Sequence, residues 1–412
     1  MPTFLAAALV ASPLAAQLAL PQVQVPDPGG VVGGVTDTLD RTLEDVDSRI
    51  EREAARLLQL RERATRRRLR ENRDTIEPDA NGDLARRGEL LVDGASPTQL
   101  SAMQGAGFAV LASETIEGLD FAVIRLAIPA GMTLARAEVL ASQLAPEAEV
   151  SPDNLHFQSG EAAGSGAGAV VVPMALQGAS SIGTEVGIID SAPGTSIATV
   201  ATRGFARGAP KPANHGSAVT SLLRQAGVAR VRVADVYGAD PAGGNALAVA
   251  KALGWLVASG SKVVTISLVG PKNAVVGKAI AAAQRKGVVV VAAVGNDGPA
   301  APPPYPASYS GVVAITGVDG RGRAMIEAGR ALHLDYAAPG ADVYALDASG
   351  KRRKWRGTSF AAPLAAARLA AALERGGSWR ARLDAEARDL GKKGPDATYG
   401  RGLLCGGCGR KK

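Results

Sequence analysis

The chain has 412 residues, with 46 lysines and arginines against 39 aspartates and glutamates, a formal net charge of +7, and two cysteines. This length allows a large hydrophobic core together with a second, smaller domain. The most basic run, residues 61–73, lacks the interleaved aromatic side chains on which bases stack, so the net charge does not indicate a nucleic-acid partner. Two cysteines are too few ligands for a zinc site.

Residues 1–26 carry no charged side chain and are rich in alanine and leucine. Pro13 interrupts the apolar run, and the small residues Ala16 and Ala19 are typical of a signal-peptide cleavage site. We therefore predict a signal peptide over residues 1–19. A membrane anchor is the alternative, but the run is short and interrupted for a spanning helix.

Residues 20–83 form a charged helical and linker region, in which apolar residues recur at helical spacing over residues 36–75. Residues 61–73 hold seven arginines against two glutamates. Such a run can bind nucleic acid or anionic lipid, but we favour a solvated helix face or a protease-sensitive spacer. A function in helix-mediated assembly at the cell surface stays open.

Residues 84–157 show a β-α-β-β-α-β order of elements. The expected strands cover residues 89–93, 108–111, 121–126 and 149–157, and the expected helices cover residues 96–104 and 133–144. This order predicts a small ferredoxin-like α+β sandwich. Residues 158–175 follow as a flexible linker rich in glycine, serine and alanine.

Residues 176–412 alternate apolar strands with helices of small residues. The expected strands cover residues 185–190, 231–236, 263–268, 288–294 and 312–316, and the expected helices cover residues 246–259, 274–286 and 359–375. The pattern predicts a mainly parallel sheet in a three-layer α/β/α domain.

Ser359 lies at the start of the last of these helices, in the sequence Gly-Thr-Ser-Phe-Ala-Ala-Pro of residues 357–363. The N–H groups of a first helical turn have no partner within the helix, and the positive end of the helix dipole lies there. This position suits a nucleophile whose attack creates an oxyanion. The same residues are also ordinary helix caps, so the interpretation depends on further groups.

His215 is the candidate base among three histidines, because it stands at the start of a helix of small residues. His156 ends the small domain, and His333 lies in a run that alternates like a strand, so structural roles are expected for both. Asp190 and Asn296 each follow a buried strand, where functional groups of open α/β sheets gather. Both are also common turn residues.

Together these segments resemble the subtilisin-like serine protease family. The order Asp190, His215, Ser359 is the order of that family. The sequences Gly-Ile-Ile-Asp at 187–190, His-Gly-Ser-Ala-Val at 215–219 and Ala-Val-Gly-Asn at 293–296 carry the likeness, which covers about residues 178–404. The segment after Asp190 and the residues after His215 depart from the family pattern.

The resemblance implies a serine endopeptidase with a polypeptide substrate. Ser359 would be the nucleophile, His215 the base and Asp190 its orienting acid, with Asn296 in the oxyanion hole. The substrate-binding residues that it implies are Ser267, Leu268, Val269, Gly270, Ala293 and Gly295. No cofactor is required, and structural calcium stays open because no Asp/Asn-rich loop is present.

The resemblance further implies a zymogen that is secreted or periplasmic. Residues 84–157 resemble the inhibitory propeptide of the family, whose tail lies in the active cleft, and we predict self-processing in or near the linker 158–175. A catalytically inactive scaffold protein with the same fold is the alternative. Cys405 and Cys408 are predicted to form a small disulfide in an oxidising compartment, with free thiols as the alternative.

Overall fold

The computed structural model describes residues 32–158, 161–162 and 181–404. The chain divides into two compact units, residues 1–53 and 54–412. Helix α1 (Val32–Glu71) contributes its described residues up to 53 to the first unit and residues 54–71 to the second. The predicted signal peptide, most of the linker, and Cys405 and Cys408 lie outside the described residues. No helix within the described ranges is long and apolar enough to cross a membrane.

The large domain (residues 182–404) is built on a seven-stranded sheet in the order β15-β14-β13-β11-β8-β10-β9. All adjacent strands are parallel. The strands are β8 (Val186–Asp190), β9 (Ala201–Gly204), β10 (Val231–Asp235), β11 (Val263–Ile266), β13 (Val289–Ala293), β14 (Val313–Val318) and β15 (Tyr336–Pro339). Every residue of β8, β11 and β14 is buried, because helices cover both faces of the sheet.

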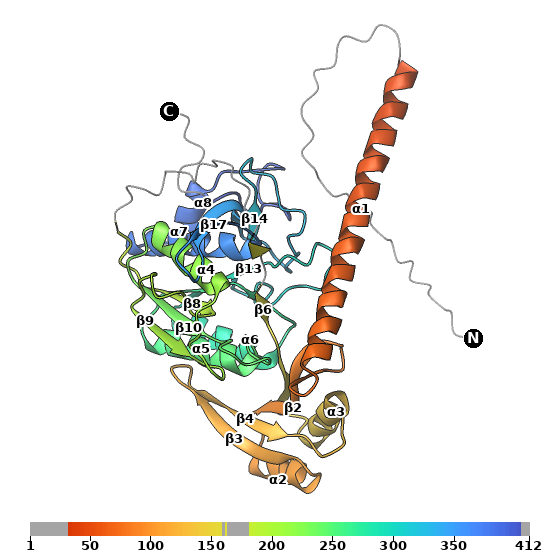
Figure 1. The fold of residues 1–412 in the computed structure, drawn as a ribbon, viewed down its shortest axis with the longest axis vertical. Coiled ribbons are helices and arrows are strands. Elements are labelled where there is room, and N and C mark those ends of the chain that lie inside the picture. The colour runs from red at the N-terminus through yellow and green to blue at the C-terminus, as the bar shows by residue number, and fades with distance from the viewer. Residues whose placement is uncertain (1–31, 159–160, 163–180, 405–412) are drawn as a thin grey trace, which may run out of the picture. The chain divides into compact units, whose positions relative to one another are not determined.

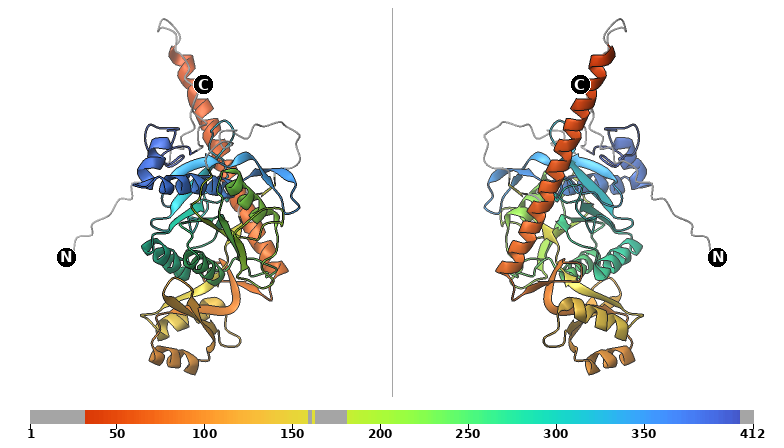
Figure 2. Two further views of the ribbon diagram at one scale, coloured as in Figure 1. Left: turned by 90° about the vertical axis from the view of Figure 1, so that its left-hand side faces the viewer. Right: turned by 90° about the vertical axis from the view of Figure 1, so that its right-hand side faces the viewer.

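Two helix layers enclose this sheet, as Figures 1 and 2 show. The four helices of these layers are α4 (Asn214–Gln225), α5 (Ala246–Ala258), α6 (Ala274–Arg285) and α7 (Thr358–Glu374). The apolar faces of α5 and α6 pack in one core cluster, and those of α4 and α7 pack in another. The predicted three-layer α/β/α domain is confirmed. Helix α8 (Trp379–Glu386) packs beside α7.

The run around His333 alternates like a strand in the sequence but forms no strand in the structure. Strand β15 begins only at Tyr336. The preceding residues bond to the start of β14: His333 Nε2 lies 2.8 Å from the Val312 carbonyl, and Asp335 accepts from the Ala314 N–H. These bonds hold the segment as a bend before β15.

The small domain (residues 76–158) contains an antiparallel sheet in the order β1-β2-β4-β3, with β5 also paired to β2. Its elements are β1 (Ile76–Pro78), β2 (Leu84–Asp93), α2 (Pro97–Gly105), β3 (Ala109–Ile116), β4 (Phe121–Ala127), α3 (Leu134–Leu144) and β5 (Glu149–Asn154). Both helices pack on one face of the sheet. The other face packs against the large domain through Leu91, Ile116, Leu119 and Val123, which share a core with α5 and α6.

The end of the small domain differs from the sequence prediction of one strand over residues 149–157 and a linker from residue 158. Strand β5 stops at Asn154, where the chain passes to the large domain: the Leu155 N–H still donates to the Leu84 carbonyl of β2, but Leu155 also forms a bridge with Asn245, and the His156 N–H donates to the Gly244 carbonyl. A separate strand β6 (Phe157–Gln158) then pairs with β12 (Leu268–Val269), and β7 (Glu161–Ala162) pairs with β17 (Arg352–Arg356). Strand β16 (Ala341–Leu346) completes the sheet around β17.

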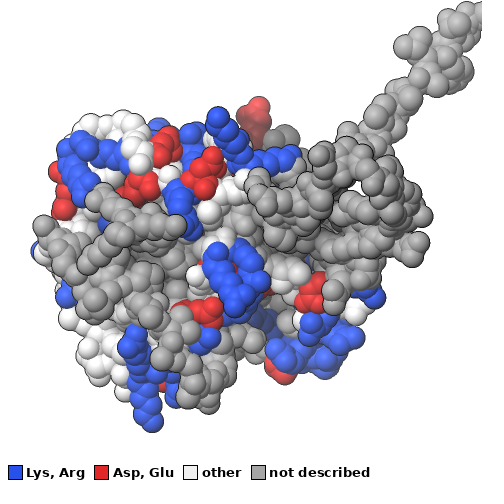
Figure 3. Space-filling view, turned by 90° about the horizontal axis from the view of Figure 1, so that it is seen from above, with Lys and Arg blue, Asp and Glu red and all other residues white. Residues whose placement is uncertain are grey.

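Figure 3 shows basic and acidic side chains of described residues interspersed on one face of the molecule. Several arginines form ion pairs at domain surfaces, among them Arg125 with Glu89, Arg232 with Glu185 and Arg368 with Glu386. Among the described residues visible in Figure 3, basic side chains therefore lie close to acidic ones.

Candidate active site

Asp190 ends strand β8 and is fully buried. Its carboxylate accepts hydrogen bonds from the Ser191 N–H (2.7 Å) and from the Ser191 hydroxyl (3.1 Å). Nδ1 of His215 lies 2.8 Å from Oδ2 and 3.0 Å from Oδ1. An acid and an imidazole are thus held together at the carboxyl end of the sheet.

The start of α4 fixes the position of His215. The Gly216 N–H donates to the Ser191 hydroxyl at 3.1 Å, which ties the helix to the end of β8. A Cβ atom at Gly216 would lie 2.0 Å from the Ser191 carbonyl oxygen, so only glycine permits this approach. The His215 ring also packs on Phe360, with ring centroids 5.4 Å apart.

Ser359 stands in the first turn of α7, one residue before Phe360. Gly357 precedes the helix with a φ of 151°, a conformation that favours glycine. The Ser359 hydroxyl donates to the Ser267 carbonyl at 3.1 Å, and the Ser267 hydroxyl donates to the Ser359 carbonyl at 2.9 Å. This pair of bonds holds the serine beside the strand that the sequence predicts to bind substrate.

Asn296 follows β13 and is held by the same helix start. Its side-chain Oδ1 accepts the Thr358 N–H at 3.0 Å. Because the oxygen end of the amide is fixed in this way, the NH2 end is the one that can donate to an oxyanion near Ser359.

The structure therefore brings Asp190, His215, Asn296 and Ser359 to one end of the parallel sheet. The predicted substrate-binding residues border the same place: Ser267, Leu268, Val269 and Gly270 in and around β12, and Ala293 and Gly295 at the end of β13. His333 lies apart, bonded to Val312.

A sequence model of the subtilase family matches residues 193–402, about half of the chain. The chain belongs to the subtilase family. The match contains His215, Asn296 and Ser359, and it begins three residues after Asp190. The hydrogen bonds between Asp190 and His215 therefore connect the acid to the matched region.

Known relatives agree with this assignment. This subtilase is 28% identical to the minor extracellular protease Epr of Bacillus subtilis, over 46% of this chain and 30% of that protein. It is 32% identical to subtilisin DY of Bacillus licheniformis, over 39% of this chain and 61% of that protein. The match thus spans less than two thirds of these relatives.

A solved structure shares the fold of this subtilase at low sequence identity. The crystal structure of fervidolysin from Fervidobacterium pennivorans, a keratinolytic enzyme related to subtilisin, superposes with a TM-score of 0.64 and 16% identity. The superposition covers 81% of this chain and 62% of fervidolysin. At this identity the likeness establishes the fold.

The end of the small domain lies across the candidate site. We call residues Leu155–Gln158 the tail. Gln158 pairs with Leu268 in the β6–β12 ladder, and its side-chain Nε2 donates to Asp190 at 2.8 Å and to the Ser191 hydroxyl at 3.0 Å. Sequence reasoning placed a tail in the cleft but missed Gln158 as its contact, although Gln158 directly follows the last predicted strand.

The second-unit part of α1 contacts the same region, which the sequence did not predict. The Arg68 guanidinium lies 4.0 Å from the Phe157 ring centroid. Arg61 forms an ion pair of 3.3 Å with Asp297, the residue after Asn296. The helix residues 54–71 therefore brace both the tail and the loop of the candidate oxyanion donor.

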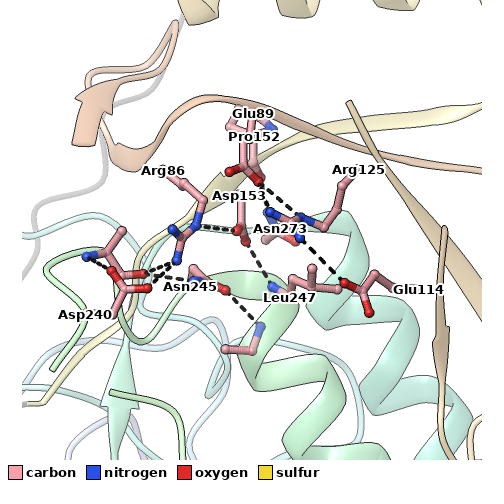
Figure 4. A network of polar contacts seen from close by, with 12 residues as sticks. Arg86, Glu89, Glu114, Arg125, Pro152, Asp153, Asp240, Asn245, Leu247 and Asn273 are labelled. Atoms are coloured by element: carbon pink, nitrogen blue, oxygen red, sulfur yellow. Dashed lines mark hydrogen bonds and ion pairs between the residues drawn. The ribbon is translucent and has the colours of Figure 1, made fainter. Parts of the chain in front are cut away.

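A buried polar network joins the two domains, as Figure 4 shows. The Leu247 N–H at the start of α5 donates to Asp153 at 3.0 Å, and Arg86 lies 3.5 Å from the same carboxylate. Asn273, at the start of α6, donates to the carbonyl of Pro152. Burial raises the pKa of Asp153 to about 6, although the N–H bond and Arg86 oppose this shift.

His156 is the other buried titratable group of this junction. The backbone N–H of His156 donates to the Gly244 carbonyl, and the backbone carbonyl of His156 accepts a hydrogen bond from the Tyr237 hydroxyl at 2.8 Å. Among the described residues, neither imidazole nitrogen makes a well-formed hydrogen bond. Burial lowers the pKa of His156 to about 4, which nearby backbone groups of Gly244 and Asn154 offset only in part.

Asp153 and His156 give opposite pH dependences to the docking of the tail and the adjoining end of the small domain onto the large domain, which we call tail docking. Undocked His156 takes up a proton as pH falls from 6.5 towards 4, so acid weakens docking in that window. Docked Asp153 holds its proton up to about pH 6 against 3.8 for the ordinary carboxyl, so docking weakens as pH rises between these values. Because each group binds one proton, it changes the docking equilibrium constant by up to about tenfold per pH unit within its window.

We therefore expect little change in tail docking between pH 7 and pH 5 in the Ser359→Ala chain. In the Ser359→Ala chain that also carries His156→Phe, the tail should dock about tenfold more tightly at pH 5 than at pH 7. In the chain that instead carries Asp153→Asn, it should dock about tenfold more weakly at pH 5 than at pH 7. Hydrogen exchange of the tail amides, corrected for the intrinsic effect of pH, measures this. A pH response that is the same in both variants would contradict the opposing assignment.

Within the described part of the chain, no group of three or more histidine, cysteine, aspartate or glutamate side chains could hold a metal ion. The groups at the candidate site are those of acid–base and nucleophilic chemistry.

Proposed function

We propose that this subtilase is a serine endopeptidase, made as a self-processing zymogen and acting in a secreted or periplasmic location. The location draws support from the extracellular relative and from the predicted signal peptide. Ser359 is the nucleophile and His215 its general base. Asp190 orients the imidazole, and Asn296 with the Ser359 N–H binds the oxyanion.

The chemistry follows from the contacts of these groups. The Asp190 carboxylate accepts the Nδ1–H of His215, so Nε2 is the nitrogen that takes the Ser359 proton as Oγ attacks the peptide carbonyl. The negative charge that develops on the carbonyl oxygen is met by the NH2 group of Asn296. His215 then gives the proton to the leaving amine, and water hydrolyses the acyl group from Ser359 by the same steps in reverse.

One observation carries this proposal. A peptide of the chain itself, residues Phe157–Gln158, lies antiparallel on β12 and bonds to Asp190. The described peptide resumes at Glu161–Ala162 on β17, the strand that leads into Gly357 and Ser359. A peptide chain that enters on β12 and leaves on β17 is bound as a substrate would be.

This arrangement supports processing between Gln158 and Glu161. The Ser267 carbonyl, which accepts the Ser359 hydroxyl, belongs to the residue just before β12. Continuing the antiparallel register one residue past Gln158 leads to Ser267. We therefore propose that the cut lies within residues 158–161, at the near end of the predicted linker.

The test compares the wild-type chain with Ser359→Ala and, as a matched control, with Ser101→Ala at an exposed serine of α2. We expect the wild-type and Ser101→Ala proteins to be cut within residues 158–161 and to bind a fluorophosphonate probe at Ser359. The Ser359→Ala chain should stay intact and unlabelled. Intact-mass measurement and N-terminal sequencing give the cut, and peptide mapping gives the labelled residue.

Two results would contradict the proposal. Clipping of purified Ser359→Ala protein without added protease would overturn self-processing. A wild-type chain that neither binds the probe nor hydrolyses any peptide would favour the scaffold alternative.

A further inference from the structure

We infer that Val269 narrows the subsite for the residue directly before the scissile bond, so that the enzyme cleaves after small residues such as alanine, serine and glycine. This inference rests on the proposed peptidase function. It adds a substrate class, which the sequence comparison did not provide.

The register of the tail defines which side chains share this subsite. Phe157 lies opposite Val269, and Gln158 lies opposite Leu268. Side chains directly opposite in an antiparallel pair lie on the same face, and neighbours along a strand alternate. Because Gln158 points to Asp190, the next residue of a bound peptide points to the other face, the face of Phe157 and Val269.

That next residue stands before the scissile bond. It lies opposite Ser267, whose carbonyl accepts the Ser359 hydroxyl at 3.1 Å. Its carbonyl carbon is therefore the one within reach of the nucleophile, and its side chain faces the space between β12 and the end of β13.

Val269 fills part of this space. A Cβ atom built on Gly295 would lie 2.9 Å from one methyl carbon of Val269 and 3.4 Å from the other. The isopropyl group thus occupies the space next to Gly295 into which a side chain would project, at the junction of β13 and Asn296. Gly295 has a φ of 82° and offers no side chain that could move aside.

A substrate side chain must share the remaining room with this isopropyl group. Pocket walls packed at interior density cannot easily make room for a substrate side chain that is too large. In specificity pockets, one methylene changes the preference for a substrate by about 10-fold to 200-fold. The sequence after Gln158 reads Ser-Gly, which satisfies this restriction. Large aromatic or branched residues at the same position do not.

The test uses the processed enzyme and the peptides Leu-His-Phe-Gln-X-Gly-Glu-Ala, which carry the sequence of residues 155–162 with X in place of serine. We expect kcat/KM for X = Ala, Ser or Gly to exceed that for X = Phe or Leu by at least about tenfold. Val269→Ala should narrow this ratio about tenfold or more. Val200→Ala, the same change at an exposed valine, should leave the ratio unchanged.

Val269→Ile serves as a second variant, which enlarges the side chain by one methylene and should favour glycine further over alanine and serine. A wild-type preference for Phe or Leu, or a ratio that neither Val269 variant moves, would overturn this inference while leaving the peptidase function intact. Absence of any Ser359-dependent hydrolysis would overturn the proposed function, and this inference with it.

Discussion

Replacing Asp190 by asparagine is expected to lower kcat by about 10⁴-fold. The carboxylate lies 2.8 Å from His215 Nδ1 and can only accept, so it keeps the proton on that nitrogen. An asparagine amide can donate to Nδ1 instead, which places the proton on Nε2 and removes the base that Ser359 needs. The geometry would be preserved while the tautomer is wrong. Steady-state hydrolysis of a peptide by the processed enzyme measures the loss.

Asp235→Asn is the matched control for this change. Asp235 occupies the equivalent register position on the neighbouring strand β10, directly beside Asp190, and is equally buried. Its carboxylate accepts backbone N–H groups of Lys211, Tyr237 and Gly238. We expect this variant to lower the melting temperature with little loss of kcat. Equal losses of kcat in both variants would show that Asp190 acts only through stability.

Replacing Asn296 by alanine is expected to lower kcat by about 10²-fold to 10³-fold with a smaller change in KM, because in the proposed mechanism its amide donates to charge that develops in the transition state. The same change removes the acceptor of the Thr358 N–H, so a modest loss of stability, of about 1 kcal/mol, accompanies it. Asn296→Asp separates the two effects. It keeps an oxygen for Thr358 but places negative charge at the oxyanion, so kcat should fall at least as far.

Asp297→Asn tests whether the expected loss of kcat in Asn296→Ala comes from disturbing the loop rather than from removing the Asn296 amide. Asp297 is the next residue and pairs with Arg61 of α1 at the surface. Once residues 54–158 have been released, this variant should retain wild-type kcat. A full kcat in Asn296→Ala would remove Asn296 from the oxyanion hole and leave the Ser359 N–H as its donor.

Local sequence predicted the large domain and the four candidate catalytic positions because each has a nearby signal. Asp190 ends and Asn296 follows apolar runs that become buried strands, with only the first residue of β13 partly exposed, and His215 and Ser359 begin helices of small residues. Burial on both faces of a parallel sheet leaves few other places for such runs.

The contacts that cover the site could not be predicted in this way, because they join residues far apart in the chain. Gln158 is held by β12 and Asp190, and nothing in its own neighbourhood distinguishes it from a linker residue. Arg61 and Arg68 fit a solvated helix face equally well until their partners, Asp297 and Phe157, are known. The strand-like alternation around His333 likewise gave no sign that His333 and Asp335 bond to Val312 and Ala314.

The brace of α1, the small domain and the tail all lie on one piece of chain, residues 54–158. A single cut within residues 158–161 would therefore turn all three from an intramolecular cover into a separate ligand of the active site. Before the cut, their effective concentration at the cleft is on the order of millimolar or higher, whatever the amount of protein present. After the cut, occupancy depends on the actual concentration of the fragment, so simple dilution becomes the trigger that uncovers Ser359.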